Sequence, residues 1–158
     1  MKKISLVLSL ILLLTGLLGC QQKEETKEPT ITGEVTEIPY TPEEAIANGD
    51  IVNLHGKTSN LQRLNAFRKH VNDGVEDEIR ITIYTVEGAP IFYDLDYDGE
   101  MIQYTYDNSH DGYAGSDQGR KSTSCSKFVS EHEDNMVKYS LSGCSSEIGD
   151  TFYFTVQE

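Results

Sequence analysis

The sequence predicts an α+β fold, in which an antiparallel sheet of about six strands, a meander of hairpins, carries one main helix and one short helix packed on one face. The first observation is a change of period: apolar residues recur every three or four positions up to Gly74 and every second position from Glu78 onward. The second is that short turns join most of the later segments. Because helical patterns come first and strands follow, we expect the helices to share one face of the sheet.

Two helices are predicted before the strands. In the first, Thr41 is a typical N-cap residue, Pro42 takes the first helical position and Gly49 ends the helix. The main helix spans residues 60–72 and begins at the segment 59–62, which has the pattern of a capping box. Its apolar stripe, which we expect to contact the sheet, consists of Leu61, Leu64, Phe67 and Val71.

After a strand of alternating isoleucines from residue 79, the strongest strand signal lies on either side of Asp98-Gly99. Residues 91–97 and 100–106 both alternate, and Asp-Gly between two such runs is typical of a two-residue type I′ turn with positive φ at both positions. One face of this hairpin is then apolar and the other acidic. The opposed pairs are predicted to be Tyr97 and Glu100, Leu95 and Ile102, Tyr93 and Tyr104, and Ile91 and Tyr106.

Three further strands are predicted, over residues 121–129, 136–143 and 151–156. If Asp134-Asn135 closes the hairpin between the first two, Cys125 lies directly opposite Cys144. Opposed residues lie close enough for a disulfide, and such bonds persist in exported proteins. Closing a loop of about 20 residues contributes roughly 3 kcal/mol in the chain-entropy model. We therefore predict a structural disulfide between Cys125 and Cys144.

The first 39 residues have the pattern of an export signal and a tether. Lys2 and Lys3 precede a short apolar run, and the segment 17–20 ends in Cys20, so residues 1–19 are predicted to be a lipoprotein signal peptide. Residues 20–39 are then the lipidated Cys20 and a disordered acidic tether, and residues 40–158 form a single globular domain. This predicts a protein anchored by lipid to the outer face of the cytoplasmic membrane.

The charge of the chain limits its partners. The formal net charge is −13, and removal of residues 1–19 takes away Lys2 and Lys3 and no acid, which leaves 11 basic against 26 acidic residues, a net charge of −15. A surface of this charge is a poor partner for nucleic acid. We expect a monomer whose partners are the membrane, through Cys20, and an unidentified protein or small-molecule ligand.

A calcium site is the alternative interpretation of the hairpin. Asp94, Asp96 and Asp98 match the opening of a calcium loop, but the twelfth position of the loop, which needs a bidentate acid, is Thr105. In a strand, Asp94 and Asp96 also stand about 7 Å apart, too far for one ion to draw on both directly. The aspartates are better explained as the solvated face of the hairpin, and we predict no metal and no cofactor.

The loop of residues 107–120 is the candidate binding segment. It is polar, rich in glycine and long for a compact domain, which is typical of a functional or mobile loop. Its candidate binding residues are Asp107, His110, Asp111 and Tyr113. No G-x-S-x-G pattern and no zinc-type spacing occurs in the chain, so we predict that the protein is not an enzyme.

Several segments together resemble a family of small lipoproteins from bacilli, the domain of unknown function 4362. The resemblance covers residues 40–144, and its motifs are the segments 48–56, 90–95 with Asp98-Gly99, 104–109, and Cys125. It implies a surface lipoprotein of a Gram-positive bacterium and brings no assigned activity. The favoured hypothesis is a non-enzymatic binding module. A divalent-cation (calcium) binding lipoprotein is the alternative, and a hydrolase with an unrecognised site comes third.

Overall fold

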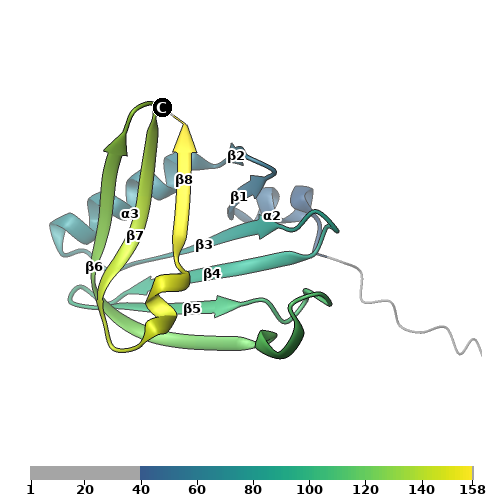
Figure 1. Cartoon of the computed structure of the whole chain (residues 1–158). Helices are drawn as coiled ribbons and strands as arrows, with labels where there is room; N and C mark the ends of the chain where they lie inside the picture. Colours follow the sequence, from purple (N-terminus) through teal and green to yellow (C-terminus); the bar gives the residue numbers. More distant parts are fainter. Residues whose placement is uncertain (1–39, 158) are drawn as a thin grey trace, which may run out of the picture. The chain divides into compact units, whose positions relative to one another are not determined.

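The computed structural model describes residues 40–157, so the predicted signal peptide, Cys20 and the tether lie outside the described residues. Within these residues, two α-helices, eight strands and two short 3₁₀ helices follow one another (Figure 1). In order, they are α2 (Pro42–Asn48), β1 (Ile51–Leu54), β2 (Lys57–Ser59), α3 (Leu61–Asp73), β3 (Asp77–Tyr84), β4 (Pro90–Tyr97), β5 (Ile102–Asp107), η2 (Gly115–Asp117), β6 (Arg120–Glu133), β7 (Met136–Cys144), η3 (Glu147–Thr151) and β8 (Tyr153–Gln157). Neither described α-helix has the length and apolar character needed to cross a membrane.

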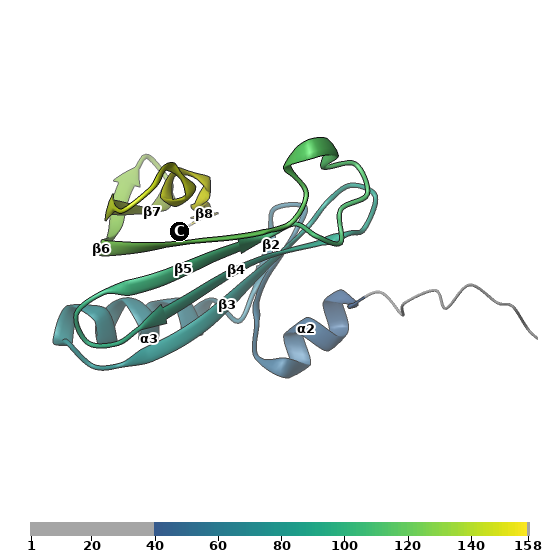
Figure 2. The same ribbon diagram turned by 90° about the horizontal axis from the view of Figure 1, so that it is seen from below.

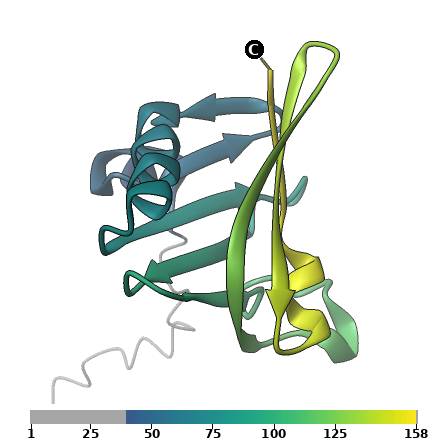
Figure 3. The same ribbon diagram turned by 90° about the vertical axis from the view of Figure 1, so that its left-hand side faces the viewer.

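The strands form one curved, nearly closed sheet in the order β2-β1-β3-β4-β5-β6-β7-β8. The second half of β6, together with β7 and β8, runs crosswise to β3 to β5, because the long strand β6 first pairs with β5 and then carries the sheet around the bend (Figures 1 and 3). The α+β class is confirmed. The six-stranded antiparallel meander was too simple, because β1 and β2 were missed and β1 pairs in parallel with β3.

The two helices cover opposite faces of the sheet, which corrects the prediction that they share one. Successive residues of a strand point to opposite faces. Ile51 of β1 packs in the main core with Leu64 and Phe67 of α3, whereas Val52 packs with Ala45 of α2. We call the side of α3 the inner face and the side of α2 the outer face; α2 stands apart from α3 in Figure 2. The crossover between parallel strands β1 and β3 contains α3, which is why this helix lies on its own side.

The β4–β5 hairpin has a register two residues away from the predicted one. Tyr97 lies opposite Ile102 rather than Glu100. Of the two predicted turn residues, only Gly99 has a positive φ, of 95°. The Asp98 side chain accepts hydrogen bonds from the backbone N–H groups of Glu100 and Met101. The turn is therefore centred on Gly99 and Glu100, and the type I′ prediction was wrong. Because a shift of two residues keeps every side chain on its face, the apolar and acidic faces are as predicted.

The β6–β7 hairpin has the predicted register. Cys125 lies opposite Cys144, Asp134 adopts a positive φ of 53° in the closing turn, and the two sulfur atoms are joined in a disulfide. Gly149 of η3 lies against this bond, where a Cβ atom would come within 2.2 Å of the Cys144 Sγ atom. The disulfide is thus part of the packed inner face.

The main helix begins by a different mechanism from the predicted capping box. Its N-cap residue, Asn60, makes no side-chain cap hydrogen bond and has a positive φ of 57°. The Asn60 amide instead donates to the backbone oxygens of Ile46 and Asp50. This side chain ties the end of α2 and the start of β1 to the start of α3.

Candidate functional site

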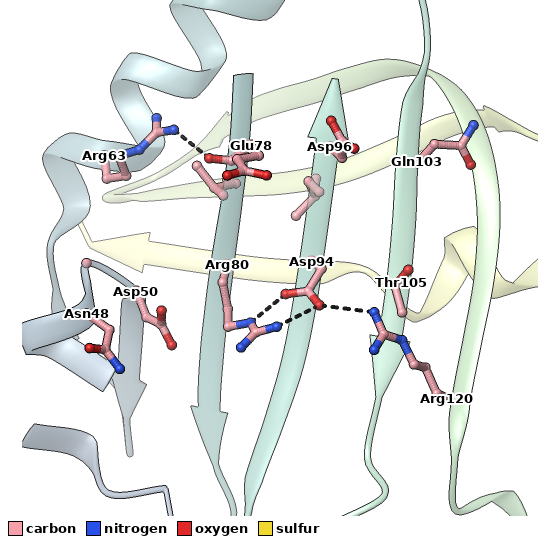
Figure 4. Close-up of a pocket in the computed structure, with 13 residues that line it drawn as sticks. Asn48, Asp50, Arg63, Glu78, Arg80, Asp94, Asp96, Gln103, Thr105 and Arg120 are labelled. Atoms are coloured by element: carbon pink, nitrogen blue, oxygen red, sulfur yellow. Dashed lines mark hydrogen bonds and ion pairs between the residues drawn. The ribbon is translucent and has the colours of Figure 1, made fainter. Parts of the chain in front are cut away.

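An open groove of about 620 Å³ lies on the outer face of the sheet, between the end of α2 and the start of β6 (Figure 4). Strands β3, β4 and β5 supply its floor, because every second residue of each strand points to this face. The charged side chains that line the groove are Asp50, Arg63, Glu78, Arg80, Asp94, Asp96 and Arg120.

Two arginines share one carboxylate at the centre of the groove. The Arg80 Nε and Nη2 atoms donate to the two carboxylate oxygens of Asp94 over 2.6 and 3.0 Å, and the Arg120 Nη2 atom lies 3.8 Å from Asp94 Oδ2. The hydrogen bonds to Asp94 raise the pKa of the Arg80 guanidinium above its ordinary value. Arg80 also lies over the Phe92 ring, 4.8 Å from its centroid. Arg80 is therefore fixed, whereas the Arg120 side chain is 63% exposed and makes only the longer contact.

Two carboxylates oppose each other at the other end of the groove. Glu78 of β3 and Asp96 of β4 are paired in the sheet register, and both are exposed. Among the described residues no cation lies within ion-pair distance of either carboxylate. The nearby Arg63 guanidinium binds the Asp77 carboxylate and the backbone oxygen of Glu78. Directly opposed like charges destabilise a sheet, so this end of the groove is suited to a positive group from outside.

A buried carboxylate forms one wall of the groove. Asp50 is only 7% exposed, and its Oδ2 atom accepts hydrogen bonds from the Thr82 hydroxyl over 2.6 Å and from the Tyr40 hydroxyl over 3.0 Å. The Tyr84 hydroxyl donates to the Tyr40 backbone oxygen, and burial raises the pKa of Tyr84 to about 12. These neutral hydroxyls keep the wall in one geometry over the physiological pH range.

The predicted calcium residues make other contacts. Asp94 binds the two arginines, while Asp98 lies in the turn, where backbone N–H groups of Met101 and Glu100 lower the pKa of its carboxyl group. Within residues 40–157, no group of three or more His, Cys, Asp or Glu side chains is placed to hold a metal ion. Of the three aspartates, Asp94 and Asp96 line the groove, and Asp98 does not.

The residues of the predicted binding loop do not converge on a site. Asp107 and Asp111 each accept a hydrogen bond from the backbone N–H two residues later, and the Tyr113 side chain is 80% exposed. Burial acts to raise the pKa of Asp107, but the hydrogen bonds from Ser109 outweigh it and the pKa is lowered. The His110 ring packs edge-on against Phe92. This loop borders the outer face, but these four residues do not line the groove.

The sequence matches a known family model over the part that builds the groove. The model is that of the Domain of unknown function (DUF4362), and it matches residues 48–140, more than half of the chain. The chain belongs to this family. No curated protein and no solved structure matches it. Every groove-lining residue of this DUF4362 chain, from Asn48 to Arg120, lies within the matched part.

The arginines of the groove were missed in the sequence. The chain has four arginines, and three of them, Arg63, Arg80 and Arg120, line the groove of this DUF4362 protein. They are 57 residues apart from first to last, so only the strand pairing brings them together. The feature of the sequence that could have pointed to these residues is the scarcity of arginine in so acidic a chain.

Proposed function

We propose that this DUF4362 protein is a non-enzymatic, lipid-anchored module that binds a protein or a small molecule in the outer-face groove. The observation that carries the proposal is the gathering of three of the four arginines in one open groove, on a chain of net charge −13. A guanidinium presents several donors in a rigid fork and is suited to recognising carboxylates and phosphates. Arg120 supports this use, because its exposed donors are not consumed by a short contact within the protein.

The anchor in this proposal is Cys20, which carries the acyl chains after residues 1–19 are removed. The membrane is then the first partner, and the site of action is the outer face of the cytoplasmic membrane of a Gram-positive bacterium. Because each buried CH₂ adds about 0.8 kcal/mol, two or three acyl chains hold a soluble domain at the bilayer for long times. The protein acts there as a monomer, without a cofactor and without nucleic acid.

Binding is tested with the purified full-length protein in detergent and fractionated low-molecular-weight extracts of the cell envelope. The measurement is the melting temperature, since a ligand that binds only the folded state raises it. We expect at least one fraction to raise the melting temperature of the parent. Arg120→Gln should lose this rise.

The matched control is Arg68→Gln, which removes the one arginine outside the groove. It should respond to the same fraction as the parent does. If no fraction raises the melting temperature, or if Arg120→Gln and Arg68→Gln respond equally, the groove is not a binding site and the proposal fails.

Anchoring is tested separately by Cys20→Ala. The thiol is the only group at this position able to carry the lipid, so the variant should take up no clickable fatty acid and should leave the membrane fraction. Cys125 and Cys144 are joined to each other and provide the internal control for labelling. Continued labelling of Cys20→Ala would contradict the lipoprotein assignment and leave the groove experiment unaffected.

A further inference from the structure

We propose that the groove binds a short peptide with free termini, its carboxylate at Arg120 and Arg80 and its ammonium group between Glu78 and Asp96. This inference rests on the proposed function and names the class of ligand. The groove is bipolar: the cations lie beside Asp94 and the uncompensated acids lie one step further along β4 (Figure 4). A ligand of one charge alone would satisfy one end and be repelled by the other.

The cationic end of the groove keeps free hydrogen-bond donors, because the carboxylate within it, that of Asp94, is bound mainly by Arg80. Asp94 is fully engaged by the Arg80 fork, so Arg120 reaches it only at 3.8 Å. The Arg120 guanidinium therefore keeps most of its donors for a carboxylate from outside. Asp94 itself holds Arg80 in place and prevents the two cations from moving apart.

The acidic end is the complement of an ammonium group. Glu78 and Asp96 face each other across β3 and β4 without a counter-ion among the described side chains. An ammonium group placed between them replaces a like-charge repulsion by two charge-assisted hydrogen bonds. The positive charge of Arg63 does not do this, because its fork is bound to Asp77 and to a backbone oxygen.

The distance between the two ends selects the size of the ligand. Asp94 and Asp96 are two residues apart on one strand, so the two ends of the groove are about 7 Å apart along β4. An extended peptide also advances about 3.5 Å per residue, so two or three residues match this spacing. A single amino acid is too short to reach both ends.

Neutral polar side chains of β5 lie beside the two ends, on the side of the groove away from β3. Gln103 is opposite Asp96 and Thr105 is opposite Asp94 in the sheet register. The Gln103 Nε2 atom donates to the Ser124 hydroxyl, which leaves its Oε1 atom to accept from a ligand N–H. Thr105 shares a hydrogen bond with the Ser122 hydroxyl. The β5 side of the groove is therefore suited to hydrogen bonding with a peptide amide.

The experiment is calorimetric titration of the purified full-length protein in detergent with dialanine and trialanine. Their N-acetylated and C-amidated forms remove the ammonium and the carboxylate, one at a time. We expect the free peptides to bind and each blocked form to bind at least tenfold more weakly. Arg120→Gln should weaken the free peptides by tenfold or more, as should the double change Glu78→Gln with Asp96→Asn, whereas Arg68→Gln should bind as the parent does.

Each variant should also lose the response to blocking only that peptide terminus which binds at its own end of the groove. Arg120→Gln should become insensitive to C-amidation, and the double acid variant should become insensitive to N-acetylation. Equal binding of free and blocked peptides, or no binding of either free peptide, overturns the assignment. If an envelope fraction still raises the melting temperature through Arg120, the proposed function stands and only the ligand class is wrong.

Discussion

The inner and outer faces of the sheet are built by the same strands and carry side chains of opposite character. On β4, Leu95 is buried in the main core, whereas its neighbours Asp94 and Asp96 line the open groove. The inner face is closed by α3 and by η3, while α2 covers only the part of the outer face next to β1. The alternation of side chains along each strand thus separates two tasks: inner residues hold the fold, and outer residues are free to recognise a ligand.

The sharpest test of this division is Phe67→Ala on α3. Phe67 is fully buried, and its ring packs edge-on against Phe128 of β6, so its loss leaves a cavity between the helix and the sheet. We expect the free energy of unfolding to fall by about 3–5 kcal/mol. On the outer face, Thr105→Ala should change it by less than about 1 kcal/mol. Urea unfolding followed by circular dichroism measures both, and equal losses would contradict the division between the faces.

Loss of the disulfide should have the next largest effect. Replacing Cys125 and Cys144 together by alanine should cost about 3 kcal/mol, because the bond closes a loop between β6 and β7. Mass spectrometry of the parent without reductant should show the cross-linked peptide. Free thiols at both positions would refute the bond, and an unchanged unfolding midpoint in the double variant would show that it does not stabilise the inner face.

Contact between the disulfide and η3 is tested by Gly149→Ala. An added methyl group would clash with Cys144 Sγ, so the chain around η3 has to shift, and we expect a loss of about 1–3 kcal/mol. Gly112→Ala is the matched control, because Gly112 has no positive φ and nothing lies within 4 Å of its added Cβ. Thermal melts of the two variants should therefore differ clearly, and similar melting temperatures would exclude tight packing at Gly149.

The sequence predicted which face of the sheet each strand residue points to better than it predicted which residues pair across neighbouring strands. The register of β6 and β7 was correct because two independent features, the turn at Asp134-Asn135 and the two cysteines, require the same pairing. For β4 and β5 only the turn was available, and Asp98 uses its side chain to cap the turn instead of taking a positive φ. The resulting error of two residues left the faces unchanged, because side chains alternate with a period of two.

The candidate site was harder to predict than the fold. Arg80 and Asp94 belong to neighbouring segments, but Arg120 comes after a long loop, and its place beside Asp94 depends on how β6 begins. Strands β1 and β2 have only four and three residues, too few to show alternation, so the wall at Asp50 was also missed. The loop after β5 was predicted to bind a ligand because it is long and polar. These two features do not reveal that backbone N–H groups of the loop already donate hydrogen bonds to the Asp107 and Asp111 carboxylates.

Acid should weaken the contact between α3 and β3 at the rim of the inner face. Burial acts to raise the pKa of Asp77, but hydrogen bonds from Arg63 and His70 outweigh it, and the pKa is lowered overall. A carboxyl group whose pKa is lower in the folded than in the unfolded state stabilises the fold at pH values above its unfolded pKa. This stabilisation is lost as the pH falls through the pKa of the folded state. We therefore expect the free energy of unfolding to fall below about pH 4.

Asp77→Asn identifies the group responsible for this acid dependence. The variant should lose about 1.5–3 kcal/mol at neutral pH, which is typical of hydrogen bonds to a charged group, and should show a shallower fall below pH 4. Urea unfolding at a series of pH values from neutral to acid measures both effects. A variant with the same acid dependence as the parent would assign the effect to other carboxylates.

The smallest effect is expected at Asp96, where the binding and calcium hypotheses make opposite predictions. Asp96 is exposed, has no ion-pair partner among the described residues and lies opposite Glu78. Removing its charge relieves a repulsion, so Asp96→Asn should be neutral or stabilising by less than about 1 kcal/mol, with or without Ca²⁺. Asp94→Asn is the contrasting variant, because it also releases the Arg80 fork and should lose stability.

If Asp96 were a calcium ligand, Ca²⁺ would raise the melting temperature of the parent and not of Asp96→Asn. Thermal melts of the three proteins with Ca²⁺ and with a chelator decide this, and such a Ca²⁺-dependent rise would assign the outer face to a cation instead of a peptide.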